Sequence, residues 1–439
     1  MNRALKCIPI AALSLLGAVG CNDFLSGGDL DTDPNNPPAA TNSQLFVAAQ
    51  ASMWALHLSD PARLGAVFVQ QYTGGGLGYL AIEEYDLDES TTNGIFTGIY
   101  TGGGLIDIRR LQANVREAGD SIYLGQAQVL EALVMGAAAD IFGDVVYSAA
   151  YGEENPPLDE QLSVYDQIQT LLDDAIENLA ATGPTNFGAG AADLNYGGDP
   201  EPWTRLAWTL KARYYLHTAE VRGATAYAAA RDAASKGLTD PDEDYKAQFS
   251  GNAGEENFTT VFVQLRSGYI SPNPFFVNLL ESRSDPRLTR YFDDDAEGLS
   301  DELLASDYDP PIVSAAENRL IWAEAAFRTG QTGVAQTQLT AARAIAGLPS
   351  VTASLGEILT EKYIALFQTL EPWNDYKRTC FPNIAPNAGK TTIPARLYYD
   401  TRDRQTNTSI PDPTAQPVRN DNDPPNAVDD VTGAECLGQ

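Results

Sequence analysis

Apolar side chains recur every three or four positions along most of the chain, and this spacing predicts a protein built mainly of helices. The first clear case covers 44–58, for which Ser43 is the expected N-cap. A strand is expected at one place, the β-branched and aromatic run FTTVFVQ over 258–264. The remaining predicted helices cover 61–72, 105–119, 124–142, 164–179, 203–221, 227–236, 278–281, 314–329, 333–346 and 354–370.

The predicted helices form consecutive pairs. In the pair over 314–346, small residues stand where two helices would cross, at Ala323, Ala326, Ala342 and Ala346. This pair is similar to a degenerate tetratricopeptide unit, and 203–237 and 124–179 are interpreted as two further pairs. We therefore predict a mainly α fold in which tetratricopeptide-like helix-turn-helix repeats build an α-superhelical scaffold with long loop insertions. No linker interrupts 44–398, so this range is expected to be one body.

The first 43 residues have the layout of an export signal followed by a tether. Arg3 and Lys6 precede an apolar run that is shorter than the roughly 20 residues a membrane-spanning helix needs. Small residues then lead to Cys21 in an arrangement that resembles a bacterial lipobox, although Ala18 stands where leucine is usual. Residues 1–20 are therefore predicted to be a lipoprotein signal peptide, and Cys21 to carry acyl chains such as palmitate. Plain secretion, with Cys21 as an ordinary thiol, remains the alternative. The glycine- and proline-rich segment 21–43 is predicted to be a flexible tether.

The charge balance of the chain limits the classes of molecule that it can bind. The chain carries 59 acidic against 28 basic residues, a formal net charge of −31. Such a surface repels phosphate backbones and anionic lipid, which argues against nucleic-acid binding. Membrane contact is expected only through the lipid on Cys21. The segment 399–439 is rich in proline and aspartate and is predicted to be an acidic tail that is mobile or lies along the surface.

Cysteine usage predicts one disulfide. Cys7 leaves with the signal peptide and Cys21 is assigned to lipid, so Cys380 and Cys436 remain. An exported compartment permits these two to bond, and the bond would fix the tail. Two free thiols are the alternative.

The sequence predicts neither a metal site nor a bound cofactor. The chain has only two histidines, and His217 falls on the apolar face of 203–221, where a core histidine with satisfied nitrogens is expected. The spacing of Asp29, Asp31 and Asp33 begins like a calcium loop, but Pro34 and Ala40 occupy the decisive later positions. The C-terminal segment contains four aspartates that lie close together in sequence: Asp421, Asp423, Asp429 and Asp430. A metal ion is not predicted there, because such aspartates are usually solvated.

Five blocks in order resemble the SusD/RagB family of outer-membrane nutrient-binding lipoproteins. They begin with the Cys-Asn-Asp-Phe-Leu start at Cys21 and its Asp-Pro-Asn tether. Next come DIFGDVVYSAA over 140–150 and DLNYGGDPEPWTRLAWTLKARYYL over 193–216. Asp-Pro-Arg-Leu over 285–288 and EKYIALFQTLEPWNDYKRTCFP over 361–382 complete the series. The sequence departs from the family pattern at Val146, Cys380 and the acidic tail.

The resemblance implies a lipid-anchored protein of the Gram-negative outer membrane that faces the cell exterior. Such a protein captures nutrient oligomers, with oligosaccharides favoured over peptides, and delivers them to a SusC-like TonB-dependent transporter. The implied ligand face comes from the loop insertions, where aromatic faces and polar groups suit sugars. Eight candidate contacts follow, each of which also has a purely structural interpretation: Tyr72, Tyr79, Tyr85, Tyr100, Arg266, Tyr269, Asn273 and Phe275.

The alternatives are two other classes of protein, a surface glycoside hydrolase and a protein-binding adaptor. A surface glycoside hydrolase needs two carboxylates about 5 to 10 Å apart across one bond, and adjacent acids such as Glu83 and Glu84 do not supply that geometry. No metalloprotease or serine-hydrolase motif accompanies them, so no enzymatic activity is predicted. A helical-repeat adaptor that binds only protein is the second alternative, distinguished by a lack of affinity for small ligands.

Overall fold

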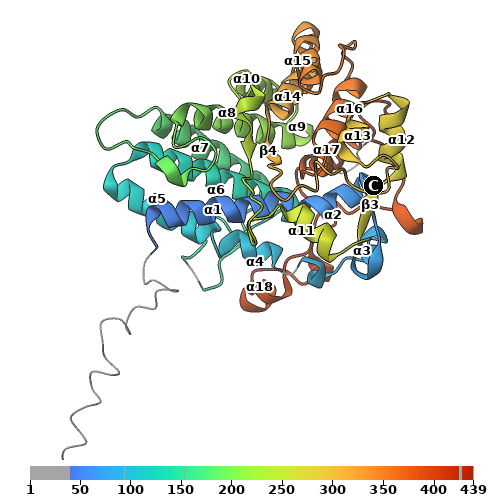
Figure 1. Ribbon diagram of the computed structural model, residues 1–439. Coiled ribbons are helices and arrows are strands. Elements are labelled where there is room, and N and C mark those ends of the chain that lie inside the picture. Colours follow the sequence, from blue (N-terminus) through green and yellow to red (C-terminus); the bar gives the residue numbers. More distant parts are fainter. Residues whose placement is uncertain (1–39, 93, 153, 425–427, 439) are drawn as a thin grey trace, which may run out of the picture. The chain divides into compact units, whose positions relative to one another are not determined.

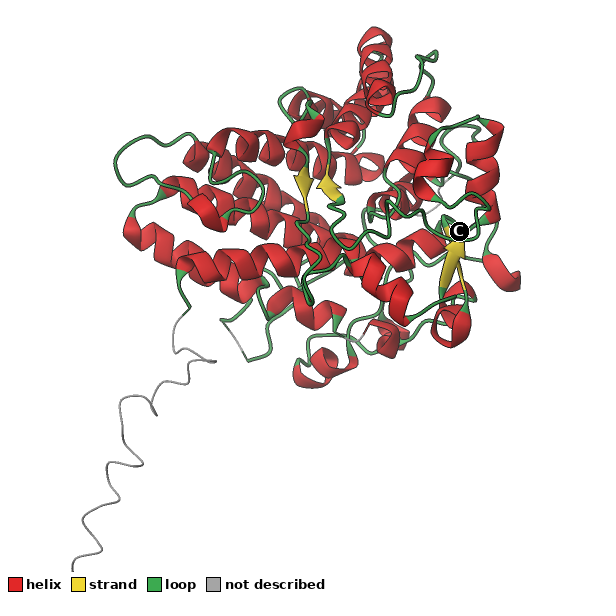
Figure 2. Ribbon diagram, in the orientation of Figure 1, coloured by secondary structure: helices red, strands yellow, loops and turns green. Residues whose placement is uncertain are grey.

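A computed structural model describes residues 40–438 apart from 93, 153 and 425–427. The predicted signal peptide, the predicted lipidation site Cys21 and almost all of the predicted tether lie outside the described residues. Residues 42–439 form one compact unit. Within it, helices dominate and strands are few (Figures 1 and 2), as the apolar spacing predicted.

The helices follow one another closely along the chain. The first half contains α1 (Asn42–Leu58), α2 (Asp60–Phe68), α3 (Gly76–Glu83), α4 (Ile95–Tyr100), α5 (Leu105–Ala118), α6 (Ser121–Phe142), α7 (Gln161–Leu179), α8 (Pro200–His217), α9 (Ala219–Arg222) and α10 (Ala224–Ala234). The second half contains α11 (Phe258–Leu265), α12 (Pro274–Ser282), α13 (Arg287–Tyr291), α14 (Ala315–Arg328), α15 (Thr332–Ile345), α16 (Leu355–Ala365), α17 (Glu371–Thr379) and α18 (Thr401–Thr406).

Helix pairs stack into the predicted repeat scaffold. The pairs α6–α7, α8–α10 and α14–α15 pack against one another in that order, and α1 and α5 flank α6 (Figure 1). Alanines line the contacts because a small side chain lets two helix backbones approach: Ala230 and Ala325 are fully buried between pairs, and Ala326 and Ala335 within the last pair. Sequence periodicity therefore identified the scaffold correctly.

Helix α6 is the centre of this body. It is the one described helix long and apolar enough to cross a membrane by composition, and 94% of that stretch is buried inside the protein. Gly136 is required at its crossing with α8, because a Cβ there would lie 2.1 Å from the hydroxyl of Tyr214. That hydroxyl donates a hydrogen bond to the carbonyl of Ala132 at 3.0 Å. Close packing thus fixes α6 as a core helix.

Two short antiparallel sheets join segments that are distant in sequence. Strand β1 (Tyr72–Gly74) pairs with β3 (Ile270–Pro272), so that Thr73 lies opposite Ser271. Strand β2 (Tyr245–Lys246) pairs with β4 (Pro311–Val313). The first sheet joins the two loop insertions.

The strand expected at 258–264 is wrong: this segment is helix α11. Its N-cap is Asn257, whose side chain accepts hydrogen bonds from the amides of Thr259 and Thr260 at 2.8 and 3.3 Å. β-branched residues lower helix propensity only slightly, so a good cap and tertiary packing decide the outcome here.

Other predicted helices differ at their ends. The first begins at Asn42, so Ser43 is inside the helix rather than its cap, and the second ends at Phe68. The predicted helix over 203–221 is interrupted after His217, and the one over 354–370 ends at Ala365. In the latter case Gln368 adopts a left-handed backbone conformation with φ 69°, which no α-helix can contain.

The acidic C-terminal segment contributes to the core, which its composition did not indicate. The side chain of Asn420 donates to the carbonyl of Asp140 at 2.9 Å, and that of Asn422 donates to the carbonyl of His217 at 3.0 Å. These carbonyls lie in the last turns of α6 and α8, where helical partners are lacking. Both asparagines are 4% exposed, so this part of the segment is neither mobile nor on the surface.

Cys380 and Cys436 are bonded, as the cysteine usage predicted. The bond closes a loop across a sequence separation of 56 residues. On the chain-entropy account, closing a loop of this length stabilises the fold by about 4 kcal/mol. The disulfide therefore holds the C-terminal segment against α17.

Candidate functional site

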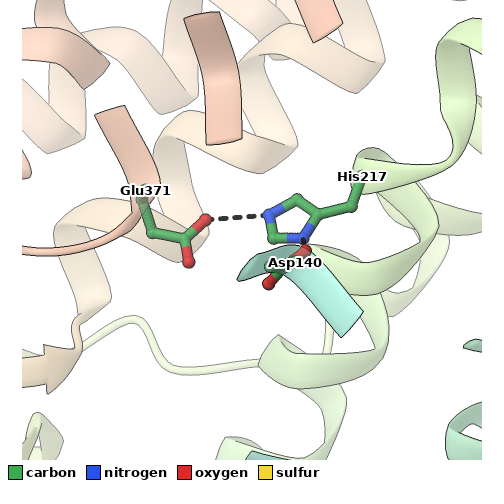
Figure 3. A group of neighbouring side chains, drawn as sticks. All are labelled: Asp140, His217 and Glu371. Atoms are coloured by element: carbon green, nitrogen blue, oxygen red, sulfur yellow. Dashed lines mark hydrogen bonds and ion pairs between the residues drawn. The ribbon is translucent and has the colours of Figure 1, made fainter. Parts of the chain in front are cut away.

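His217 is held between two carboxylates in the centre of the protein (Figure 3). Its Nδ1 lies 2.8 Å from Asp140 of α6 and its Nε2 lies 2.8 Å from Glu371 of α17. Burial alone would lower the pKa of His217, but the two carboxylates outweigh it and raise the pKa to about 9. The ring is therefore a cation at neutral pH and donates from both nitrogens.

These three residues are the one group of potential metal ligands that the described part of the chain brings together. The two ring nitrogens face different carboxylates, so one ion cannot replace both hydrogen bonds. The side chains are at most 8% exposed, which leaves no face for a substrate. We assign the cluster to the structure of the core, in agreement with the predicted role of His217.

A network of buried ion pairs extends from this cluster. Arg213 of α8 binds Glu317 of α14 through two hydrogen bonds of 2.6 and 2.7 Å. Arg378 of α17 contacts Glu324 and Asp375, each at 2.6 Å. These charges connect α8, α14 and α17. Every carboxylate named here faces a cation, so these charges are paired within the core.

The loop insertions form a partly exposed aromatic surface at the β1–β3 sheet. The rings of Tyr79 and Phe262 lie 5.2 Å apart, and that of Tyr269 lies 6.1 Å from Tyr79 and 6.3 Å from Phe262. We call these three residues the aromatic ledge. Phe262 and Tyr269 are half-buried, so parts of both rings face solvent. The exposed guanidinium of Arg266 lies 6.0 Å from the ring of Tyr269.

Polar groups adjoin the ledge. Arg63 of α2 lies 4.1 Å from the ring centre of Phe262, and it donates to the hydroxyl of Tyr79 at 3.3 Å and to Asp60 at 2.6 Å. The side chain of Asp60 is 59% exposed and borders a hollow of about 190 Å³ that Ser52 and Ser59 also line. A half-exposed aromatic face beside a carboxylate and hydroxyls is suited to a sugar ring.

Glycines make the ledge possible. A Cβ on Gly76 would lie 2.8 Å from the ring of Tyr269, and one on Gly75 would lie 2.5 Å from the carbonyl oxygen of Gly268. Gly76 also has φ +59°, which disfavours other residues. The glycine-rich stretch therefore lets the first insertion lie directly against the second.

Of the eight predicted ligand contacts, Arg266 and Tyr269 are accessible at this place, and Tyr79, which is 7% exposed, supports their surface from within the ledge. Two more form its support. Tyr72 is 1% exposed and its hydroxyl accepts a hydrogen bond from Gln368 at 2.7 Å. Asn273 is 8% exposed and its side chain caps α12 and donates to the hydroxyl of Thr73 at 3.1 Å. Both are too enclosed to touch a large ligand.

The other three lie elsewhere. Phe275 is 36% exposed and packs 6.3 Å from Tyr363. Tyr100 is half-buried against Phe96, with 5.2 Å between the ring centres. Tyr85 follows α3 and lines a separate groove. Sequence reasoning missed Asp60, Arg63 and Phe262: the predicted helix began at 61, one residue after Asp60, and Phe262 was placed in an expected strand.

A further cavity of about 410 Å³ lies between the α14–α15 pair, α13 and the segment after α16. None of the predicted ligand residues lines it. Two of its three lining cations, Arg287 and Arg290, pair with Asp285 at 2.7 Å and Glu302 at 3.2 Å. The third, Lys246, lines the cavity together with Asp242, Asp244 and Asp309.

The fold and the loop surface together define a helical-repeat protein that presents an aromatic, sugar-compatible site on inserted loops. The chain belongs to the SusD-like family described as "Starch-binding associating with outer membrane", whose pattern matches residues 34–309. A comparison with curated proteins finds no match.

Solved structures with the same fold agree with this assignment. One is a chitin-binding SusD homolog from Flavobacterium johnsoniae, with 19% identity, a TM-score of 0.73, and coverage of 87% of this chain and 99% of that one. Another is a SusD/RagB family protein from Bacteroides thetaiotaomicron, with 20% identity, a TM-score of 0.70, and coverage of 90% and 100%. The predicted fold class and family resemblance are both confirmed.

Proposed function

We propose that this protein captures oligosaccharides at the outer surface of a Gram-negative outer membrane and delivers them to a SusC-like TonB-dependent transporter. The observation that carries the proposal is the aromatic ledge beside the exposed carboxylate of Asp60. A sugar ring would pack its apolar face on Tyr269, while its hydroxyls bind Asp60, Ser59 and Arg266. Family membership and the chitin-binding homolog support carbohydrate over peptide.

Capture without catalysis follows from the same geometry. Asp60 is bound by Arg63, and among the described residues no second carboxylate lines the hollow beside it. A glycosidase needs two carboxyl groups across the scissile bond. The protein is therefore proposed to bind glycan and release it unchanged.

Attachment is proposed to occur through Cys21. Several acyl chains on one residue would hold the protein on the membrane without a spanning helix, since each buried methylene contributes about 0.8 kcal/mol. The helical pairs then offer a rigid surface on which a transporter can dock.

Replacing Tyr269 with alanine is expected to weaken glycan binding by about 30-fold, the cost of truncating an aromatic anchor in a recognition site. Isothermal titration with chitin and starch oligosaccharides measures this. Tyr215→Ala is the matched control, because Tyr215 is also half-buried but belongs to α8 of the scaffold. Equal affinities for the wild type and Tyr269→Ala would reject the ledge as the site.

Delivery is tested by purification of a tagged protein from a detergent extract of the outer membrane of its host. A TonB-dependent transporter is expected to copurify with the wild type. Cys21→Ser, which cannot be acylated, should be recovered mainly outside the membrane fraction. Purification of the membrane-bound wild type without a transporter would contradict delivery, and binding of other proteins with no glycan affinity would favour the adaptor alternative.

A further inference from the structure

A second groove lies between the loop after α3 and the C-terminal segment. It consists of two adjoining hollows of about 350 and 330 Å³ that share Leu87, Tyr398 and Pro413 as lining residues. Tyr85 borders the first hollow and Ser90 the second. We call this feature the Tyr398 groove. Its walls come from segments far apart in sequence, so no local pattern indicated it.

The lining is rich in hydroxyl groups, and its charged groups are bound within the protein. Among the described residues, no acid lines the first hollow. In the second hollow, Glu89 pairs with Arg404 at 2.5 Å, and Asp88 accepts a hydrogen bond from the hydroxyl of Ser90 at 2.5 Å. Within the described residues, the hydroxyls of Thr391, Thr392, Thr414 and Tyr398 make no hydrogen bond to the protein. These groups are therefore available to a ligand that offers many hydroxyls of its own.

Apolar surface accompanies the hydroxyls. The side chains of Tyr85, Leu87 and Tyr398 are half-buried, and Val418 is 77% exposed. Both cations of the first hollow have partners in the protein: Arg396 donates to the carbonyls of Phe142 and Pro417 at 2.5 and 3.1 Å, and Lys390 pairs with Asp86 at 3.0 Å. A ligand with apolar faces and neutral hydroxyls, such as a pyranose chain, matches this lining.

One segment borders both the groove and the ledge. Tyr79 of the ledge lies on α3, Tyr85 and Leu87 of the groove follow directly, and Gly94 and Gly98 line the hollow beside Asp60. The 76–98 segment thus touches all three places. A long ligand could contact more than one of them at once.

We propose that the Tyr398 groove is a second binding subsite for neutral glycan, so that long oligomers engage the groove and the ledge together. The proposal rests on the proposed function and extends it by making this protein selective for chain length. Once one end of an oligomer is bound, the other end is held at high effective concentration near the second subsite. Short oligomers lack this advantage because they reach only one subsite.

Titration with a series of chitin oligosaccharides from the disaccharide to the octasaccharide, and with the starch series, tests the proposal. Wild-type affinity is expected to rise by at least about tenfold with length. Tyr398→Ala should remove most of this rise and leave the affinity for short oligomers unchanged. Thr392→Trp should do the same by filling the groove, and it removes no hydrogen bond because the exposed Thr392 hydroxyl makes none within the described residues.

Tyr151→Ala is the control, because Tyr151 is 47% exposed but does not line the groove. Circular dichroism and the melting temperature verify that each variant is folded. A steep rise with length that persists in both Tyr398→Ala and Thr392→Trp would overturn the groove while leaving capture at the ledge intact. If the wild type itself bound none of these oligosaccharides, the proposed function would be overturned instead.

Discussion

Replacing Arg378 with methionine is expected to lower the free energy of unfolding by about 3 to 5 kcal/mol. Arg378 is 1% exposed and contacts Glu324, which is wholly buried, and Asp375, which is 8% exposed. Methionine fills much of the same space but leaves these carboxylates with Lys362, 3.1 and 2.8 Å away, and Glu324 also with Arg328 at 3.5 Å. Removing one partner of a buried ion pair exposes the full cost of desolvating the other.

Urea denaturation at neutral pH measures this difference. Arg290→Met is the control, because Arg290 pairs with Glu302 at 3.2 Å but both side chains are about half exposed, at 52% and 51%. An exposed pair contributes at most about 1 kcal/mol. Equal losses in the two variants would show that the buried network does not hold α14 and α17 together.

Alkaline pH is expected to destabilise the protein through His217. An unfolded histidine has a pKa of about 6.5, whereas that of folded His217 is about 9. Its contribution is therefore fully present below pH 6.5 and is lost as pH rises from 6.5 to 9. His217→Gln should be less stable than the wild type by about 3 kcal/mol at pH 6, because two buried carboxylates lose their cation. The stability of His217→Gln should also fall less than that of the wild type between pH 6.5 and pH 9.

His57 provides a control of opposite sign. Burial and the nearby charge of Arg213 lower the pKa of His57 to about 4. The unfolded chain takes up this proton first, so stability is lost as pH falls from 6.5 to 4. His57→Gln should remove that acid-side loss and leave the alkaline side unchanged. Because the chain has only these two histidines, denaturation curves at a series of pH values separate them. Parallel curves for the wild type and His217→Gln above pH 6.5 would show that His217 is neutral.

The scaffold was predictable because its determinants are local. Helical spacing together with alanines such as Ala326 and Ala342 specifies both a helix and the face on which another helix packs. The error at α11 has a local cause too: β-branched composition suggested a strand, while the Asn257 cap was overlooked.

The site was predictable only in part. Aromatic residues in glycine-rich insertions pointed to Tyr79 and Tyr269, but sequence reasoning assigned no role to Asp60 and Arg63, which come from a scaffold helix. Tyr85 and Tyr398 meet only through tertiary folding. Composition also misjudged the C-terminal segment, because an asparagine that satisfies a helix-end carbonyl is indistinguishable in sequence from a solvated one.

Asn420 and Asn422 have a consequence for the order of folding. Their side chains bind the last carbonyls of α6 and α8. The core is therefore incomplete until residues near the end of the described chain have been synthesised. A nascent polypeptide halted earlier would lack these bonds. Dependence of the core on a segment that is synthesised so late is compatible with export of an unfolded polypeptide, as the proposed location outside the cell requires.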